Sequence, residues 1–410
     1  MDATELYQPI LGLTEPWYVE TVTVDEPTTT VTIQLAHQTG SDLFQCAHCR
    51  QNTSIYDHLP ERTWRHLDTC QYTTLVQACV PRVACPRCGV HTVRVPWAEP
   101  KARFTALFES HVIDVLLTAQ VQSRAAALLR LSAEQVESLL ARALQRGLAR
   151  RSTTQAIPHV TIDEKSLHRG QQYVSILCDG TQGAVLEVVE NRTTEAAKTL
   201  FEQGLSPAQR ATVEAVSLDM WEPFKQAAQA RTPQAAYVYD HFHISSYLND
   251  AVDQTRRAEN KRLRKQDDTT LTGTRYLWLR NPATLDETGA ARLARLTTGE
   301  LQTAAIWRFK EEFRSFFACR TVTAAQTFFQ DWCERVKTFG NAPLQKVAQM
   351  LERHWDGLVA YVEHPVTNAL AESLNTQIQL LKAKARGFRH APGFRRTILF
   401  HLGQLDLYPQ

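Results

Sequence analysis

Residues 158–190 read PHVTIDEKSLHRGQQYVSILCDGTQGAVLEVVE. Within this stretch, three apolar runs of strand length are separated by short polar segments that contain glycine. Further along the chain, helix-like and strand-like stretches alternate as far as residue 240. Three adjacent strands followed by alternating helix and strand predict a mixed α/β sheet. The expected strands are 159–167, 173–179, 184–190, 213–219 and 235–240, and the expected helices are 194–203 and 221–230.

Two aspartates stand near the ends of strands in this expected sheet. Asp163 follows the apolar start of the first strand, and Asp219 ends the fourth strand immediately before a helix. If these two strands lie side by side, both carboxylates project near the same sheet edge. Glu372 belongs to a helical pattern far along the chain, in which Asn375 and Gln379 continue one polar stripe. A helix packed across the sheet would bring Glu372 to the same edge.

Three carboxylates that converge in this way favour divalent cations. At 4 Å and an effective dielectric near 20, each pair of carboxylates repels by about 4 kcal/mol. Two Mg²⁺ or Mn²⁺ ions about 3.5–4 Å apart relieve that repulsion, activate a water or a 3′-hydroxyl, and stabilise the leaving oxygen of a phosphodiester. The leading hypothesis is metal-dependent DNA cutting, with Asp163, Asp219 and Glu372 as the ligands.

Each acid taken alone is a weak indication, because an aspartate at a strand end is commonly a turn or cap residue. Glu164 is a competing ligand, ranked second because strand alternation points it to the opposite face. Asp240 and His243 close the last expected strand, where they can line the same pocket and position the scissile phosphate. The alternative for this pair is a helix cap and a partly buried histidine.

Two Cys-x-x-Cys knuckles lie upstream, at Cys46/Cys49 and Cys85/Cys88. Each knuckle places two thiolates on one tight turn, and two such turns complete a tetrahedral Cys₄ site for one structural Zn²⁺ ion. The 35 residues between the knuckles exceed the usual ribbon spacing, and a pair of strands can fill them. The alternative is a set of unrelated buried cysteines or a redox pair.

A helix-turn-helix pattern follows the knuckles. Residues 123–130 form a short helix with Leu128 and Leu129 expected to face inward, and Ser132-Ala-Glu-Gln135 has the form of a capping box. Two helices joined by about three residues are the geometry of a protein that reads the major groove. The alternative is an ordinary helical hairpin with a solvated basic face.

Net charge is only +2, so a nucleic-acid partner must be inferred from local clusters of basic residues. Such clusters occur in the helix-turn-helix pattern, near residue 260 and near the C-terminus, and each can instead be a solvated face. The basic residues predicted to contact DNA are Arg124, Arg130, Arg142, Arg146, Arg256, Arg257, Lys382, Lys384, Arg386 and Arg389.

Length and composition bound the remaining possibilities. A chain of 410 residues is long enough for two to four domains, and its 21% charged residues are ordinary for a globular protein. The sequence shows neither a signal peptide nor an apolar run of the roughly 18–20 residues that span a bilayer. With nine cysteines, this predicts a protein of the reducing cytoplasm with no membrane association.

Taken together, these motifs resemble the transposases of the ISL3 insertion-sequence family over nearly the whole chain. The residues that carry the resemblance are the two knuckles, Arg142–Gly147, Ile162–Ser166, Ser217–Trp221, Asp240–His243, Asn249–Asp253, Thr367–Asn375, Ala385–Phe388 and Phe394–Leu399.

The resemblance implies a DDE-type catalytic domain with a ribonuclease-H-like sheet, in which Asp163, Asp219 and Glu372 are the catalytic acids. It also implies a helical insertion between the second and third acids. The expected division is a zinc module at 1–100, a helix-turn-helix domain at 101–155, a catalytic domain at 156–250 and 365–410, and an all-α insertion at 251–364.

The function implied is cut-and-paste transposition by a bacterial, nucleoid-associated protein. The N-terminal modules would bind the terminal inverted repeats of double-stranded DNA, and the carboxylates would drive strand cleavage and transfer into target DNA. Coupling two ends predicts a homodimer. Two alternatives remain: a catalytically inactive repeat-binding regulator, and a plain metal-dependent nuclease.

Overall fold

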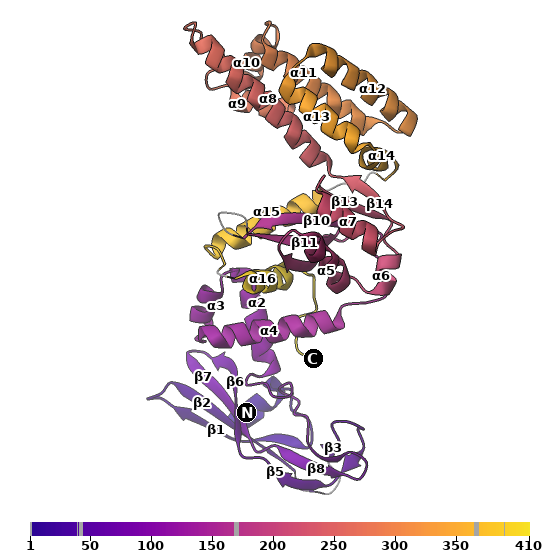
Figure 1. Cartoon of the computed structure of the whole chain (residues 1–410). Helices are drawn as coiled ribbons and strands as arrows, with labels where there is room; N and C mark the ends of the chain where they lie inside the picture. Colours follow the sequence, from indigo (N-terminus) through magenta and orange to yellow (C-terminus); the bar gives the residue numbers. More distant parts are fainter. Residues whose placement is uncertain (1, 39, 41–43, 168–171, 365–368, 389) are drawn as a thin grey trace. The chain divides into compact units, whose positions relative to one another are not determined.

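The computed structural model describes residues 2–38, 40, 44–167, 172–364, 369–388 and 390–410. The chain forms two compact units (Figure 1). Unit 1 comprises Met1–Arg151 and Leu405–Gln410, and unit 2 comprises Ser152–Gln404. Among the described helices, none has the length and apolar character needed to cross a bilayer.

Unit 1 opens with helix α1 (Ala3–Ile10) and three small sheets. Their strands are β1 (Trp17–Asp25), β2 (Thr30–His37), β3 (Phe44–Gln45), β4 (Asn52–Thr53), β5 (Ile55–His58), β6 (Arg62–Thr69), β7 (Tyr72–Ala78), β8 (Pro81–Cys85) and β9 (Gly89–Thr92). The largest sheet has the order β1-β2-β7-β6, and the others are β5-β8-β9 and β3-β4. Trp97 packs edge to face against Trp17 and Trp64, and this apolar core holds the largest sheet together.

Three helices complete unit 1: α2 (Ala106–Ala119), α3 (Gln122–Leu129) and α4 (Ala133–Arg150). The capping box at the start of α4 is present, because Ser132 and Gln135 exchange side-chain to backbone hydrogen bonds. Leu129 is buried, whereas Leu128 is 72% exposed, so the prediction that Leu128 faces inward is wrong.

The last residues of the chain, Leu405–Gln410, pack in unit 1. Arg146 and Arg150 of α4 donate to the backbone oxygens of Leu407 and Tyr408, respectively. Gly147 leaves room for this tail, since a Cβ there would overlap Leu405. The polar contacts and the fit against α4 explain why the tail leaves unit 2.

The sheet of unit 2 confirms the predicted mixed α/β architecture. Its strands are β10 (His159–Ser166), β11 (Tyr173–Asp179), β12 (Ala184–Glu190), β13 (Ala215–Leu218) and β14 (Ala236–Tyr239). They lie in the order β12-β11-β10-β13-β14. β10 is antiparallel to β11 and parallel to β13, and β13 is parallel to β14. Helices α5 (Thr194–Gly204), α6 (Pro207–Ala211) and α7 (Glu222–Arg231) connect the later strands.

From His241 the described chain of unit 2 is helical. The elements are α8 (His241–Arg264), α9 (Arg275–Leu279), η1 (Pro282–Thr284), α10 (Glu287–Thr297), α11 (Gln302–Phe313), η2 (Arg314–Ala318), α12 (Val322–Phe339), α13 (Ala342–Arg353), α14 (Trp355–Glu363), α15 (Ala369–Lys384) and α16 (Ala391–Leu402). Trp278, Phe313 and Trp332 are fully buried and form an aromatic core among these helices. Arg395 of α16 forms two hydrogen bonds, of 2.6 and 2.7 Å, with the buried carboxylate of Glu187 in β12.

Helix α14 packs against β14 through a glycine. A Cβ at Gly357 would overlap the ring of Tyr239, which is itself buried and cannot move aside. We expect Gly357→Ala to lower the free energy of unfolding by about 2 kcal/mol, because overpacking outweighs the better helix propensity of alanine. Urea unfolding measures this. Gly299→Ala is the control, since a Cβ there meets nothing closer than 3.9 Å. Equal stability of Gly357→Ala and the parent would contradict the tight contact.

Candidate active site

The register of β10 and β13 places two aspartates at the same level of the sheet. The strands are parallel neighbours, and Thr161 is opposite Ser217. Asp163 lies two residues after Thr161 on β10, and Asp219 lies two residues after Ser217, directly beyond the last residue of β13. The parallel register therefore brings the two aspartates to the same edge of the sheet.

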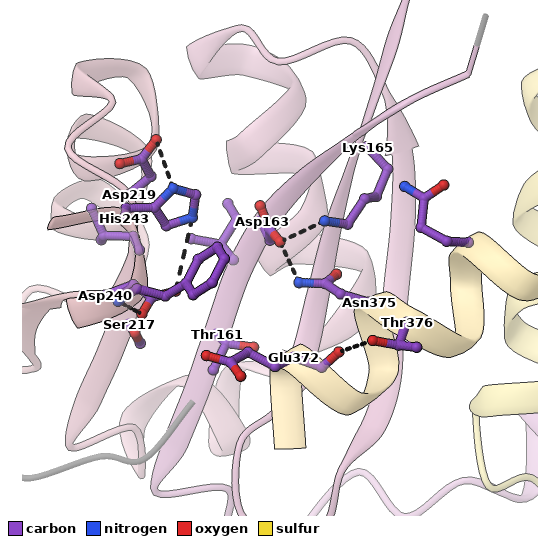
Figure 2. A pocket seen from close by; sticks show the side chains of 14 residues that line it. Thr161, Asp163, Lys165, Ser217, Asp219, Asp240, His243, Glu372, Asn375 and Thr376 are labelled. Atoms are coloured by element: carbon purple, nitrogen blue, oxygen red, sulfur yellow. Dashed lines mark hydrogen bonds and ion pairs between the residues drawn. The ribbon is translucent and has the colours of Figure 1, made fainter. Parts of the chain in front are cut away.

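These aspartates line a cavity of about 330 Å³ together with Glu372, which comes from the first turn of α15. Figure 2 shows Glu372 and Asn375 entering from this helix, with Asp163 on the strand beside them. The cavity is also lined by Asp240, His243 and Lys165. The structure thus brings the three predicted acids, and the two predicted phosphate-positioning residues, to one place.

The carboxylate of Asp163 is held by two side chains. Its Oδ2 accepts a 2.6 Å hydrogen bond from Nδ2 of Asn375 and lies 3.1 Å from Nζ of Lys165 (Figure 2). Its Oδ1 accepts a hydrogen bond from the backbone N–H of Glu164. Neither contact was assigned from the sequence, although period-two alternation places Lys165 on the same strand face as Asp163.

Glu164 points elsewhere, as alternation predicts. Its Oε1 lies 2.9 Å from the guanidinium of Arg192, and it is absent from the cavity lining. Arg192 in turn stacks over the rings of Tyr173 and Trp221. The competing assignment of Glu164 as a ligand has no support from this geometry.

His243 lies between two carboxylates. Its Nδ1 is 3.7 Å from Oδ2 of Asp219, and its Nε2 is 3.8 Å from Oδ2 of Asp240 (Figure 2). Asp240 also caps α8, because its Oδ1 accepts from the N–H of Phe242. Asp240 is therefore both a helix cap and a wall of the cavity.

The donor set suits hard cations, since carboxylate oxygens are the usual ligands of Mg²⁺ and Mn²⁺. Among the described residues, however, only the four cysteines gather three or more ligand atoms within 4.8 Å of one another. The carboxylates share a cavity at wider spacing. Like charges at 4 Å repel by about 4 kcal/mol at an effective dielectric of 20, so this spacing is what the carboxylates alone favour.

The second cluster of metal-ligating groups lies in unit 1. The four Sγ atoms of Cys46, Cys49, Cys85 and Cys88 lie within 4.8 Å of one another, which fits a tetrahedral zinc ion. Backbone N–H groups of Cys49 and His48 lower the pKa of the Cys46 thiol to about 6, which favours the thiolate that binds metal. Hydrogen bonding to Cys49 and burial raise the pKa of the Cys88 thiol to about 12.

Five of the arginines predicted to contact DNA form ion pairs, namely Arg130, Arg142, Arg146, Arg256 and Arg257. Arg146 and Arg142 both contact the buried carboxylate of Glu109 at 2.9 Å, and Arg146 also contacts Glu99. The side chain of Arg146 is only 7% exposed. Arg256 is likewise buried against Asp253 at 2.7 Å. The guanidinium groups of Arg142, Arg146 and Arg256 stabilise the helices that carry them, and their contact with DNA stays a prediction.

The other basic residues differ in exposure. Lys382 donates to the backbone oxygen of Ser166, which joins α15 to the end of β10. Arg389 lies outside the described residues. The exposed members of the predicted set are Arg124, Arg130, Arg257, Lys384 and Arg386.

Comparisons with known proteins match both parts of the chain that contain these clusters. Residues 160–398, more than half of the chain, match the family model described as the transposase of ISL3-type DDE elements. Residues 42–88 match the zinc-finger of the transposases IS204/IS1001/IS1096/IS1165.

Two curated relatives align over most of their length. The transposase for insertion sequence element IS1001 of Bordetella parapertussis is 27% identical over 88% of this chain and 86% of its own. The transposase for insertion sequence element IS1557 of Mycobacterium tuberculosis is 25% identical over 95% of this chain and 93% of its own. The chain therefore belongs to the ISL3 family of DDE transposases, and its function is that of a DNA transposase.

Proposed function

We propose that Asp163, Asp219 and Glu372 are the catalytic carboxylates, and that they hold two Mg²⁺ or Mn²⁺ ions. The observation that carries this proposal is the shared cavity, which the aspartates line from the neighbouring strands β10 and β13 and to which α15 adds the glutamate. When bound, such ions activate a water or a 3′-hydroxyl and stabilise the leaving oxygen of the cleaved strand. The reaction would be cleavage at the element end, followed by strand transfer into target DNA.

The chain's own residues would orient these carboxylates. Asn375 fixes the rotation of the Asp163 carboxylate, because it donates to one oxygen while the backbone of Glu164 donates to the other. His243 separates Asp219 from Asp240 and offers ring nitrogens toward both. Asp240 and His243 are proposed to position the scissile phosphate beside the reacting oxygens.

The architecture is consistent with a ribonuclease-H-like catalytic domain. The sheet has three antiparallel strands in sequence order, with two parallel strands added beside the first. The proposed domain comprises residues 156–250 and 365–410, and the last six of these residues pack in unit 1. The helices at 251–364 are proposed to be an insertion between Asp219 and Glu372.

DNA binding is proposed for the N-terminal modules. Helices α3 and α4 are joined by residues 130–132, which supports a helix-turn-helix that reads the terminal inverted repeats. Arg124 and Arg130 remain candidate contacts because both are exposed. Arg257, Lys384 and Arg386 are proposed to contact the DNA backbone. Because two ends must be joined, we propose a homodimer, which sedimentation of the protein with paired-end DNA tests.

Glu372→Gln tests the third ligand. We expect Mg²⁺-dependent cleavage of a cloned element end to fall by about 10²-fold, because an amide removes one negative charge from the proposed site. Binding to the same end, measured by gel shift, should stay within about threefold of the parent if only the chemistry is affected. Equal cleavage by the two proteins would remove Glu372 from the catalytic set.

The products separate a transposase from the alternatives. Joined products on supercoiled target DNA are expected for a transposase, whereas a plain nuclease would cleave without joining. A regulator would bind ends without any dependence on metal. The family match favours neither alternative.

A further inference from the structure

Among the described residues that line the active-site cavity, Lys165 is the single lysine or arginine. The cavity holds four carboxylates, those of Asp163, Asp219, Asp240 and Glu372. The other titratable group of the described lining is His243, which lies between Asp219 and Asp240. The Lys165 ammonium is thus the one lysine or arginine charge beside four carboxylates in the described lining, and it contacts Asp163.

The position of the ammonium is specific. Nζ of Lys165 lies 3.1 Å from Oδ2 of Asp163, the same oxygen that accepts from Asn375. The Lys165 side chain is 18% exposed, so it is confined by its surroundings but still reaches solvent. Because it lies two residues after Asp163 on β10, both side chains leave the same strand face. The Lys165 ammonium therefore contacts the Asp163 oxygen that would otherwise be available to a metal ion.

We propose that Lys165 has two positions in the reaction. In the metal-free protein its ammonium neutralises Asp163, and when the divalent ions bind it moves to a non-bridging oxygen of the scissile phosphate. A lysine suits this exchange because its charge is compact and its four-carbon stem is flexible. Four carboxylates and one phosphate carry five negative charges, which two divalent ions and one ammonium balance. This inference rests on the proposed two-metal function and adds a residue to it.

Removing the ammonium should therefore have opposite effects on metal binding and on catalysis. Lys165→Met is expected to bind Mn²⁺ about tenfold more tightly than the parent in the absence of DNA, about 1.4 kcal/mol, because the competing cation is gone. At saturating Mg²⁺ the same variant should cleave an element end about 10²-fold more slowly, because a charged contact to the phosphate is lost. A purely structural role would not tighten metal binding.

The experiment measures Mn²⁺ binding by calorimetry and single-turnover cleavage on the full-length protein. Lys165→Arg should restore most of the cleavage, since it retains the positive charge. Lys198→Met is the matched control: Lys198 pairs with Glu195 on α5, outside the cavity lining, and both Mn²⁺ affinity and cleavage should equal those of the parent. Thermal unfolding of Lys165→Met checks that the variant is folded.

The outcomes divide cleanly. Mn²⁺ affinity that is unchanged or weaker in folded Lys165→Met would overturn the proposal that the ammonium competes with the metal. Unchanged cleavage would overturn its contact with the phosphate. Asp163→Asn separates these results from failure of the proposed function. If it binds Mn²⁺ as tightly as the parent, the metal site itself is not at Asp163, whatever Lys165 does.

Discussion

Asp219→Asn is expected to slow cleavage of an element end by about 10³-fold or more. The substitution keeps the shape of the side chain and removes one negative charge from the cavity that Asp163 and Glu372 share. At 4 Å and an effective dielectric near 20, the attraction between the carboxylate and one unit of cation charge is about 4 kcal/mol. A loss of about 4 kcal/mol in stabilisation of the transition state corresponds to about 10³ in rate. Single-turnover cleavage at several Mg²⁺ concentrations measures the effect.

Asp219 suits this test because its removal disturbs little else. Its Oδ1 accepts one local hydrogen bond, from the N–H of Met220, and an amide oxygen accepts the same bond. The side chain is 28% exposed, so the fold does not depend on its burial. End binding and thermal unfolding should stay at the parent's values.

Asp250→Asn is the matched control for Asp219→Asn. Asp250 is exposed on α8 of the same unit and does not line the cavity. The same change of charge there should leave cleavage unaltered. If Asp219→Asn cleaves at the parent's rate, the two-metal proposal fails, and end binding alone would remain for this protein. If both variants lose activity, the loss reflects net charge and not the cavity.

The catalytic sheet could be predicted from sequence because its strands are dense in β-branched and apolar residues. The run from Val174 to Cys178, for example, is fully buried, and such runs have few alternatives to a central strand. The order of the strands could not be predicted in the same way. The parallel pairing of β10 with β13 joins segments more than 50 residues apart, and it decides whether Asp163 meets Asp219. From the sequence, the two aspartates are expected to converge only if the first and fourth strands are neighbours.

The partners of the basic residues could not be predicted from the neighbouring sequence. The segment around α4 carries an excess of arginine over acid in its own window, which predicts an exposed basic face. Two of those arginines find their partners outside that window: Glu109 and Glu99 lie 37 and 47 residues from Arg146. A pairing at that distance leaves no local signal, so a charge count within the window overestimates the number of arginines without an acidic partner. The exposure of Leu128 beside buried Leu129 is a similar case, because the sequence of a short helix does not show which of two adjacent leucines contacts the core.

The candidate site could be predicted from the sequence only in part. The three acids were identified from strand ends and a helical stripe, whereas the contacts that hold Asp163 were not. Lys165 is on the predicted face, but only the tertiary structure shows that its ammonium reaches Asp163 and that Asn375 of α15 shares the same oxygen. Helix α15 is separated from β10 by some 200 residues, so its docking depends on the whole of unit 2.

Loss of the zinc site is expected to have the other large effect, and it acts through folding. A structural Zn²⁺ ion contributes on the order of 10 kcal/mol to a small segment that lacks its own core. Here the four cysteines tie the turn after β3 to the hairpin of β8 and β9, and the sheets that they join are only two and three strands in size. We expect Cys46→Ser to lose the bound zinc, to unfold this segment, and to weaken binding to an element end by about 10²-fold or more.

Three measurements together locate the effect. Zinc content per chain is determined by metal analysis, folding of the segment by protease resistance, and end binding by gel shift at fixed salt. Cys70→Ser and Cys79→Ser are the matched controls, since both cysteines are exposed and lie outside the cluster. The larger core around Trp64 and Trp97 contains neither knuckle, so the rest of unit 1 should stay folded in Cys46→Ser. A Cys46→Ser protein that keeps one zinc per chain and full end binding would show that these thiols do not hold the metal on which DNA recognition depends.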